Sequence, residues 1–223
     1  MGQVADSLKQ FLKKVPEHIQ LVAVSKTKSN EDILDAYQFG HKTFGENKVQ
    51  ELTQKAEELP KDIDWHYIGH LQTNKVKYLA TFVGLIHAVD RLKLLKEINK
   101  QAKKNDRIIK CLLQFHIAEE DTKFGLDMDE AKAILDSEQY QNYANIEIVG
   151  VMGMATYTEN NNQIRKEFKR LHQYFDQIKR DYFPEKAAFK EISMGMSGDY
   201  QIAIDEGSTM IRVGSAIFGE RVY

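Results

Sequence analysis

Short apolar runs alternate along the chain with longer charged stretches. Eight of the runs have the length of strands, and they are LVAVS (21–25), KTFGE (42–46), WHYIG (65–69), LIHAV (85–89), IIKCLLQF (108–115), IEIVGVMG (146–153), FKEISMG (189–195) and MIRVG (210–214). Most of them are rich in apolar, β-branched or aromatic residues. Strands that are apolar on both faces are typical of a parallel sheet covered by helices.

The stretches between these runs carry apolar residues three or four positions apart, which is the spacing of amphipathic helices. They cover residues 31–39, 48–59, 74–80, 91–103, 129–137, 163–181 and 199–205. Eight strands separated by helix-length connectors predict a single α/β domain folded as a (β/α)8 TIM barrel. An open doubly wound sheet shows the same alternation. However, no Gly-x-Gly-x-x-Gly motif follows the first strand, which favours the barrel.

One further helix is predicted ahead of the first strand, over residues 3–14. Its apolar residues form one stripe, made by Val4, Leu8, Phe11, Leu12 and Val15. Such a stripe is typical of a helix that packs against the rest of the protein. Because no Gly/Ser-rich linker interrupts the chain, we expect residues 1–223 to form one domain.

Composition narrows the class of protein further. A hydrophobic content of 42% and a charged content of 29% are typical of a globular protein, and a net charge of -2 argues against binding to nucleic acid. The single cysteine, Cys111, indicates a reducing compartment. The N-terminus has no signal-peptide pattern, and no apolar stretch approaches the roughly 20 residues that span a bilayer. We therefore predict a cytoplasmic protein with no membrane partner, and the lack of a heptad pattern favours a monomer.

Functional residues of such barrels lie at the carboxyl ends of the strands and in the loops that follow. Lys26 directly follows the first apolar run, in LVAVSKTKSN. A lysine at the end of a strand is most often a solvated surface residue. A partly desolvated lysine, in contrast, loses its proton more easily, and its neutral amine condenses with an aldehyde to form a Schiff base.

The loops after the seventh and eighth strands are candidates for a phosphate site, because backbone N–H groups converge there in many barrels. Ser193 in ISMGMSGDY, and Gly214 and Ser215 in IRVGSAIFG, supply hydroxyls and a close backbone approach. The same residues also fit an alternative without phosphate, in which Ser193 lies next to a flexible turn and Gly214 and Ser215 form the tight exit of a buried strand. Arg212 inside an apolar strand requires an acceptor. That acceptor is either a nearby carboxylate, Asp205 or Glu206, or a ligand in the barrel mouth. Lysine, phosphate site and arginine together suggest pyridoxal 5'-phosphate.

Several motifs make this sequence similar to a known family. They are AVSKTK, FGENKVQE, WHYIGHLQTNK, GVMGM and SMGMSGDYQIAIDEGSTMIRVGSAIFG, and they cover the chain nearly from end to end. The sequence resembles the pyridoxal phosphate homeostasis protein family, whose fold is similar to the N-terminal barrel domain of alanine racemase. The resemblance implies that this protein binds pyridoxal 5'-phosphate and takes part in the homeostasis of this cofactor inside the cell.

The resemblance also implies roles for individual residues. Lys26 forms the Schiff base, and Arg212 faces the pyridine nitrogen. The other residues implied are Ser193, Gly214 and Ser215 at the phosphate, Asn47 and His66 lining or supporting the pocket, and Met194 against the ring.

Two functions remain open at this point: a carrier without catalysis, and a small amino-acid racemase. Enzymes that use pyridoxal phosphate as a strong electron sink usually place a carboxylate at the pyridine nitrogen, whereas an arginine leaves that nitrogen unprotonated. Alanine racemase has such an arginine but adds a tyrosine base from a second domain. Because this chain ends at Tyr223, directly after the eighth strand, we expect no such base. We therefore predict a non-enzymatic protein that either buffers the cofactor or delivers it to apo-enzymes.

A metal site is not expected. His66 and His70 are four residues apart, which would place them on one face of a helix. The segment reads as a strand followed by a loop, however, so that the two rings diverge. Cys111 has no partner at the spacing of a nucleophile and reads as a core residue.

Overall fold

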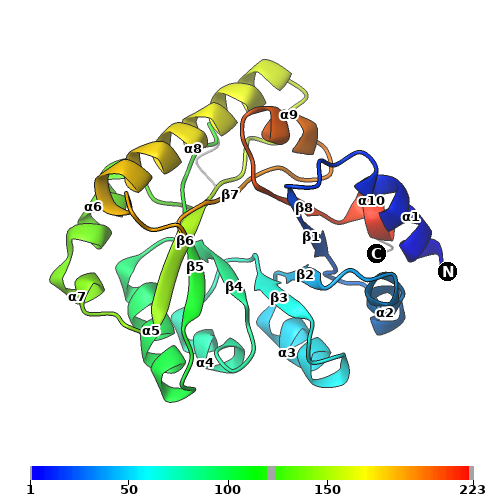
Figure 1. The fold of residues 1–223 in the computed structure, drawn as a ribbon, viewed down its shortest axis with the longest axis horizontal. Helices are drawn as coiled ribbons and strands as arrows, with labels where there is room; N and C mark the ends of the chain where they lie inside the picture. Colours follow the sequence, from blue (N-terminus) through cyan, green and yellow to red (C-terminus); the bar gives the residue numbers. More distant parts are fainter. Residues whose placement is uncertain (1, 120–123, 221–223) are drawn as a thin grey trace.

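The structure is a computed structural model that describes residues 2–119 and 124–220. Parallel strands follow chain order around a closed ring, in which β8 pairs with β1, and helices lie around the outside (Figure 1). This arrangement confirms the predicted (β/α)8 barrel. The strands are β1 (Gln20–Val24), β2 (Thr43–Glu46), β3 (Asp64–Tyr67), β4 (Leu85–Val89), β5 (Ile109–Gln114), β6 (Ile146–Met152), β7 (Glu191–Ser193) and β8 (Met210–Val213).

The helices predicted from the sequence are present, with ends that differ by at most two residues. They are α1 (Gln3–Leu12), α2 (Asn30–Gln38), α3 (Val49–Glu58), η1 (Thr73–Lys75) with α4 (Val76–Leu79), α5 (Leu92–Lys104), α6 (Met128–Asp136), α8 (Asn161–Tyr182) and α9 (Tyr200–Asp205). Two helices of four residues were not predicted, α7 (Glu138–Gln141) and α10 (Ser215–Phe218). Both are too short to show an amphipathic repeat. No helix in the described part of the chain has the length and apolarity needed to cross a membrane.

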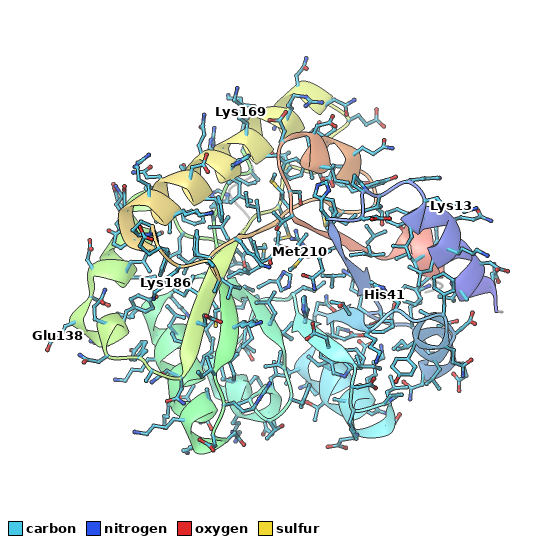
Figure 2. All side chains as sticks on the ribbon, viewed as in Figure 1. Lys13, His41, Glu138, Lys169, Lys186 and Met210 are labelled. Atoms are coloured by element: carbon cyan, nitrogen blue, oxygen red, sulfur yellow. The ribbon has the colours of Figure 1, made fainter. Side chains whose placement is uncertain are left out.

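Side chains on successive strand residues point alternately into the barrel and towards the helices. The outward residues form a large apolar cluster with the helices, and the inward residues form a smaller one. Met210, an inward residue, lies in the middle of the ring in Figure 2, whereas Lys13 and Glu138 lie at the outer edge. The inner cluster consists of Val22, Leu85, Ala88, Leu112, Val149, Met152 and Met210.

The extra helix α1 packs beside α2 and α10, at one side of the barrel (Figure 1). Phe11 is buried, and its ring lies 5.0 Å from that of Tyr200. Asp35 of α2 accepts hydrogen bonds from the backbone N–H groups of Gly2, at 2.8 Å, and of Ala5, at 3.0 Å. These bonds satisfy N–H groups that lack partners at a helix start. Four residues of the predicted stripe are buried, which confirms that α1 docks on the barrel, whereas Leu12 at the end of the helix is exposed.

Candidate functional site

Lys26 lies in the turn that follows β1, at the carboxyl end of the barrel, and its side chain is partly buried. The next residue, Thr27, has a φ of 65°. This left-handed conformation is rare for a β-branched residue, and it persists only where the surrounding structure holds it. Contacts on both sides of Lys26 should therefore fix the turn.

A buried cluster of three charged side chains provides these contacts. The Nζ of Lys55, on α3, donates to Glu46 Oε1 at 2.8 Å, to Glu51 Oε1 at 2.7 Å and to the carbonyl oxygen of Ser25 at 2.9 Å. The Ser25 hydroxyl donates to Glu46 Oε1 at 2.7 Å, and the Thr27 N–H donates to Glu51 Oε1 at 2.6 Å. The residues before and after Lys26 are thus both bonded to this cluster, which we call the Lys55 clamp.

The electrostatics of the clamp depend on its ammonium group. Glu46 is fully buried, and this desolvation raises the pKa of its carboxyl, an effect that Lys55 and Ser25 oppose. Among the described residues, Oε2 of Glu46 has no hydrogen-bond partner. Burial of a carboxylate is costly unless a partner compensates for it, so Lys55 keeps the clamp intact.

The loop after β8 passes close to the end of β1. A Cβ atom on Gly214 would lie only 3.1 Å from the carbonyl oxygen of Val24. Glycine therefore allows the backbone of residues 214 and 215 to approach the strand that carries Lys26. Val22 pairs with Arg212 in the register of β1 and β8, which places both strand ends at the same mouth of the barrel.

The loop after β7 reaches the same place. The Gly214 N–H donates to the Ser197 hydroxyl at 3.3 Å. Ser197, Gly214 and the exposed Ser215 therefore combine hydroxyls and backbone N–H groups, which is the chemistry that binds phosphate. Ser197 was not among the residues predicted for the phosphate site. The repeated serine in SMGMS was the signal for a second candidate.

Arg212 points into the barrel and is 4% exposed. Two neutral groups accept its hydrogen bonds, the Ser193 hydroxyl at 2.5 Å and the Gly153 carbonyl oxygen at 3.1 Å. The carboxylates considered as partners from the sequence, Asp205 and Glu206, instead pair with Arg165 on the surface, at 3.1 and 2.5 Å. Burial lowers the pKa of Arg212 to about 10, although Asp199 favours the charged form. Arg212 is therefore a buried cation at neutral pH.

Ser193 and His66 occupy inward positions below Arg212. The Ser193 hydroxyl is fully buried between Arg212 and His87, 3.0 Å from His87 Nδ1. His66 is 2% exposed, with Nδ1 at 3.0 Å from His87 Nε2 and Nε2 at 3.1 Å from Asp64 Oδ2. A phosphate contact for Ser193 stays a prediction, and the bonds of both residues favour a supporting role beneath the site.

The remaining predicted residues, Asn47 and Met194, have different surroundings. The carbonyl oxygen of Asn47 accepts from the Tyr67 hydroxyl at 3.2 Å, and Gly69 packs against the Asn47 backbone. Asn47 is thus fixed directly after β2 at the barrel mouth. Met194 is fully buried in the apolar layer between strands and helices. Its contact with a cofactor ring stays a prediction, to which this packing gives no support.

His66 and His70 diverge as expected, because His70 lies in the loop and pairs with Asp90 at 3.3 Å. Among the residues that the structure describes, no three His, Cys, Asp or Glu side chains gather closely enough to hold a metal ion. Cys111 is fully buried, and this burial raises the pKa of its thiol.

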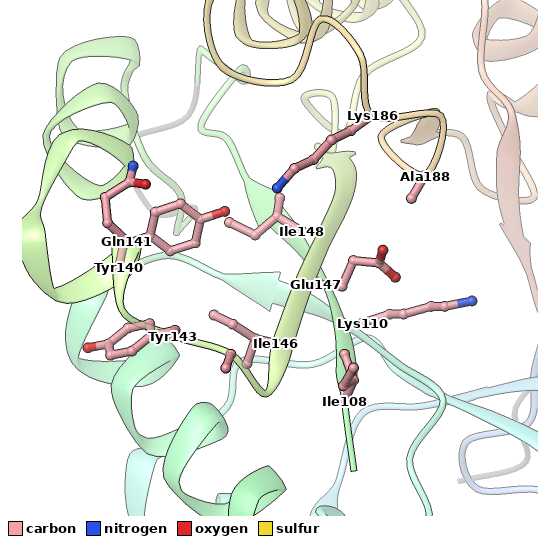
Figure 3. A pocket seen from close by; sticks show the side chains of 11 residues that line it. Ile108, Lys110, Tyr140, Gln141, Tyr143, Ile146, Glu147, Ile148, Lys186 and Ala188 are labelled. Atoms are coloured by element: carbon pink, nitrogen blue, oxygen red, sulfur yellow. The ribbon is translucent and has the colours of Figure 1, made fainter.

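Two cavities open at the opposite, amino-terminal end of the strands. One, of about 390 Å³, lies between Lys110 and Glu147 of β5 and β6 and the rings of Tyr140 and Tyr143 (Figure 3). The other, of about 640 Å³, is lined by the first residues of several strands, among them Asp64. Barrel proteins bind their ligands at the carboxyl ends of the strands, so the mouth of the barrel at Lys26 remains the candidate site.

Comparison with known proteins defines first the class and then the family. The family model described as "Alanine racemase, N-terminal domain" matches residues 1–222, in agreement with the barrel fold. A pyridoxal phosphate homeostasis protein of Aquifex aeolicus is 40% identical over 92% of this chain and 88% of its own length. The human protein of that name is 38% identical over 92% of this chain and 77% of its own. The chain belongs to the pyridoxal phosphate homeostasis protein family, which confirms the resemblance seen in the sequence.

Solved structures agree with this assignment. PipY of Synechococcus elongatus, solved without PLP, superposes with a TM-score of 0.90 at 32% identity, covering 97% of this chain and 100% of PipY. The structure of PipY with PLP bound gives a TM-score of 0.87 at the same identity and coverage. Alanine racemase from Bartonella henselae shares only the fold, with a TM-score of 0.70 at 16% identity over 99% of this chain and 61% of the enzyme.

Proposed function

We propose that this protein binds pyridoxal 5'-phosphate through Lys26 and maintains the supply of the cofactor without turning over a substrate. The close approach of Gly214 to the end of β1 carries this proposal, because it joins the lysine turn to the Ser197 and Ser215 hydroxyls. The names of the relatives and the PLP-bound structure of PipY, a similar protein, support it.

The residues present fit the cofactor. The Lys26 amine would bond the aldehyde as a Schiff base, and Gly214, Ser215 and Ser197 would hold the phosphate. Arg212 would donate to the pyridine nitrogen from below. When bound, the cofactor supplies an electrophilic carbonyl and a conjugated ring. Asn47 and His66 would support the pocket.

The chemistry of Arg212 fits a carrier, although alanine racemase works with the same kind of arginine. Its guanidinium only donates hydrogen bonds and stays charged at neutral pH. A ring nitrogen that accepts from it keeps no proton of its own, so that the ring withdraws electrons weakly. We further propose that the protein acts in the cytoplasm as a monomer of one domain and that apo-enzymes receive its cofactor.

Absorption spectroscopy tests the binding proposal. The purified protein mixed with pyridoxal 5'-phosphate should become yellow, and Lys26→Ala should abolish the covalent adduct. The matched control Lys93→Ala, which removes an exposed lysine of α5, should leave the spectrum unchanged. An unchanged spectrum in Lys26→Ala contradicts the assignment of Lys26.

A panel of amino acids tests the carrier proposal. The loaded protein should racemise none of them at an ordinary enzyme rate, and it should activate apo-enzymes faster than free cofactor does. Turnover of about 1 s⁻¹ or more on any amino acid would instead establish the alternative, a small racemase.

A further inference from the structure

Polar side chains cross the barrel interior from one mouth to the other. They occupy inward positions on β3, β4, β7 and β8, strands on opposite sides of the barrel. The successive contacts are Arg212 Nη1 to Ser193 Oγ at 2.5 Å, Ser193 Oγ to His87 Nδ1 at 3.0 Å, His87 Nε2 to His66 Nδ1 at 3.0 Å and His66 Nε2 to Asp64 Oδ2 at 3.1 Å. We call these five residues the interior chain.

The two ends of the interior chain are chemically opposite. Arg212 can only donate, and an ionised Asp64 can only accept. Asp64 is ionised at neutral pH, because the hydrogen bond from His66 lowers the pKa of its carboxyl. Its side chain is 46% exposed at the amino-terminal mouth, where it lines the larger cavity. The interior chain therefore joins a buried cation, Arg212, to a carboxylate in contact with solvent, Asp64.

These ends fix the direction of every hydrogen bond between neutral groups. The Ser193 oxygen accepts from Arg212, and its O–H points to His87 Nδ1. His87 then carries its proton on Nε2 and donates to His66 Nδ1, and His66 donates through Nε2–H to Asp64. The reverse direction would set a bare His66 Nε2 against the Asp64 carboxylate, where two acceptors repel each other. Complete burial lowers the pKa of His87 well below its usual value and so keeps the ring neutral.

We propose that His66 and His87 are positioning residues for Arg212, both in the Nε2–H tautomer, which orient its guanidinium through Ser193 and link it to Asp64. Hydrogen bonds in a chain polarise one another, so Asp64 adds to the effect of Asp199 in stabilising the Arg212 cation, whose direct acceptors are neutral. The tautomers concern the protein alone, whereas the effect on the cofactor rests on the function proposed above.

Nitrogen-15 NMR of the full-length protein without cofactor tests the tautomers directly. Long-range proton–nitrogen spectra at neutral pH should show His66 and His87 each with the proton on Nε2. His18, which is exposed, serves as the reference for a ring that samples both tautomers. A proton on Nδ1 of either buried ring, whether in the other tautomer or in a doubly protonated His66, overturns the proposal. This result does not depend on whether pyridoxal phosphate binds.

The variant Asp64→Asn tests the link to Arg212. Removal of the charge should allow His66 to populate both tautomers and should shift the absorption maximum of the bound cofactor. Cofactor binding should weaken about five- to tenfold, because one charge-assisted hydrogen bond is lost. Glu147→Gln removes a charge that lines the same cavity but lies outside the interior chain, so it should change neither the tautomers nor the spectrum nor cofactor binding. An Asp64→Asn protein with unchanged tautomers and an unchanged spectrum contradicts the proposal. Failure of the wild-type protein to bind the cofactor contradicts only the proposed function.

Discussion

The Nζ atom of Lys55 lies 2.9 Å from the carbonyl oxygen of Ser25, the residue directly before Lys26. A lysine on a helix outside the barrel thus holds the backbone that presents the candidate reactive lysine. Glu51 completes this arrangement, because it binds Lys55 and also the N–H of Thr27. The position of Lys26 therefore depends on residues that would not touch the cofactor.

Lys55→Met should destabilise the protein by about 3–5 kcal/mol, because it leaves the buried Glu46 carboxylate without its ammonium partner. Equilibrium unfolding in urea measures the loss, and retention of cofactor on a desalting column should fall with it. Lys93→Met, at an exposed position, should change stability by less than about 0.5 kcal/mol. Equal stability of the two variants would show that the Lys55 clamp does not hold the fold.

Gly214→Ala should weaken cofactor binding and lower stability by about 1–3 kcal/mol, since its Cβ would press on the Val24 backbone. Gly198 provides a matched comparison, because a Cβ there has nothing within 4 Å and should leave the unfolding free energy nearly unchanged. Titration with pyridoxal phosphate and urea unfolding measure the two effects. If Gly214→Ala binds as tightly as the wild type, the close approach of β1 and β8 is not what forms the site.

Serine variants distinguish a serine that binds the phosphate of the cofactor from one that supports the cofactor ring through Arg212. Ser197→Ala and Ser215→Ala should weaken binding of pyridoxal 5'-phosphate about tenfold or more, as expected for a hydrogen bond to a charged group, and leave binding of pyridoxal unchanged. Ser193→Ala should weaken both ligands alike, because its hydroxyl holds Arg212. A loss confined to the phosphorylated ligand in Ser193→Ala would instead make Ser193 a phosphate ligand.

The pH dependence of stability tests the bond between Asp64 and His66. This bond lowers the pKa of Asp64 below its unperturbed value of 3.8. A carboxyl with a lowered folded pKa stabilises the fold above its unfolded pKa, and this contribution is lost as the pH falls through the lowered value. Asp64→Asn should therefore be less stable than the wild type at neutral pH, and the difference should close in acid. A difference that is constant or that widens in acid contradicts the bond.

The sequence predicted the barrel because short runs, most of them rich in apolar residues, alternate with connectors of helical spacing. It also placed Lys26 and Gly214 at strand ends, and the structure brings Gly214 against Val24, two residues before Lys26. The orientation of side chains beyond the short β7 could not be predicted. Gly195 has a φ of 95°, which interrupts the alternation of faces between Ser193 and Ser197.

The supports of the site were not predictable for a related reason. Lys55 lies in a charged stretch that is typical of a solvated helix face, and only the packing of α3 on β2 shows it to be buried. His87 stands alone in the apolar run LIHAV. A histidine at an inward position of a barrel strand requires a polar partner, but the partners come from strands distant in sequence.

Reduction of the loaded protein with borohydride, followed by peptide mapping, tests the central claim most directly. Reduction fixes the ligand on whichever amine holds it. The label should appear on the peptide that contains Lys26, at about one per chain. A label on another lysine, or none at all, contradicts the account.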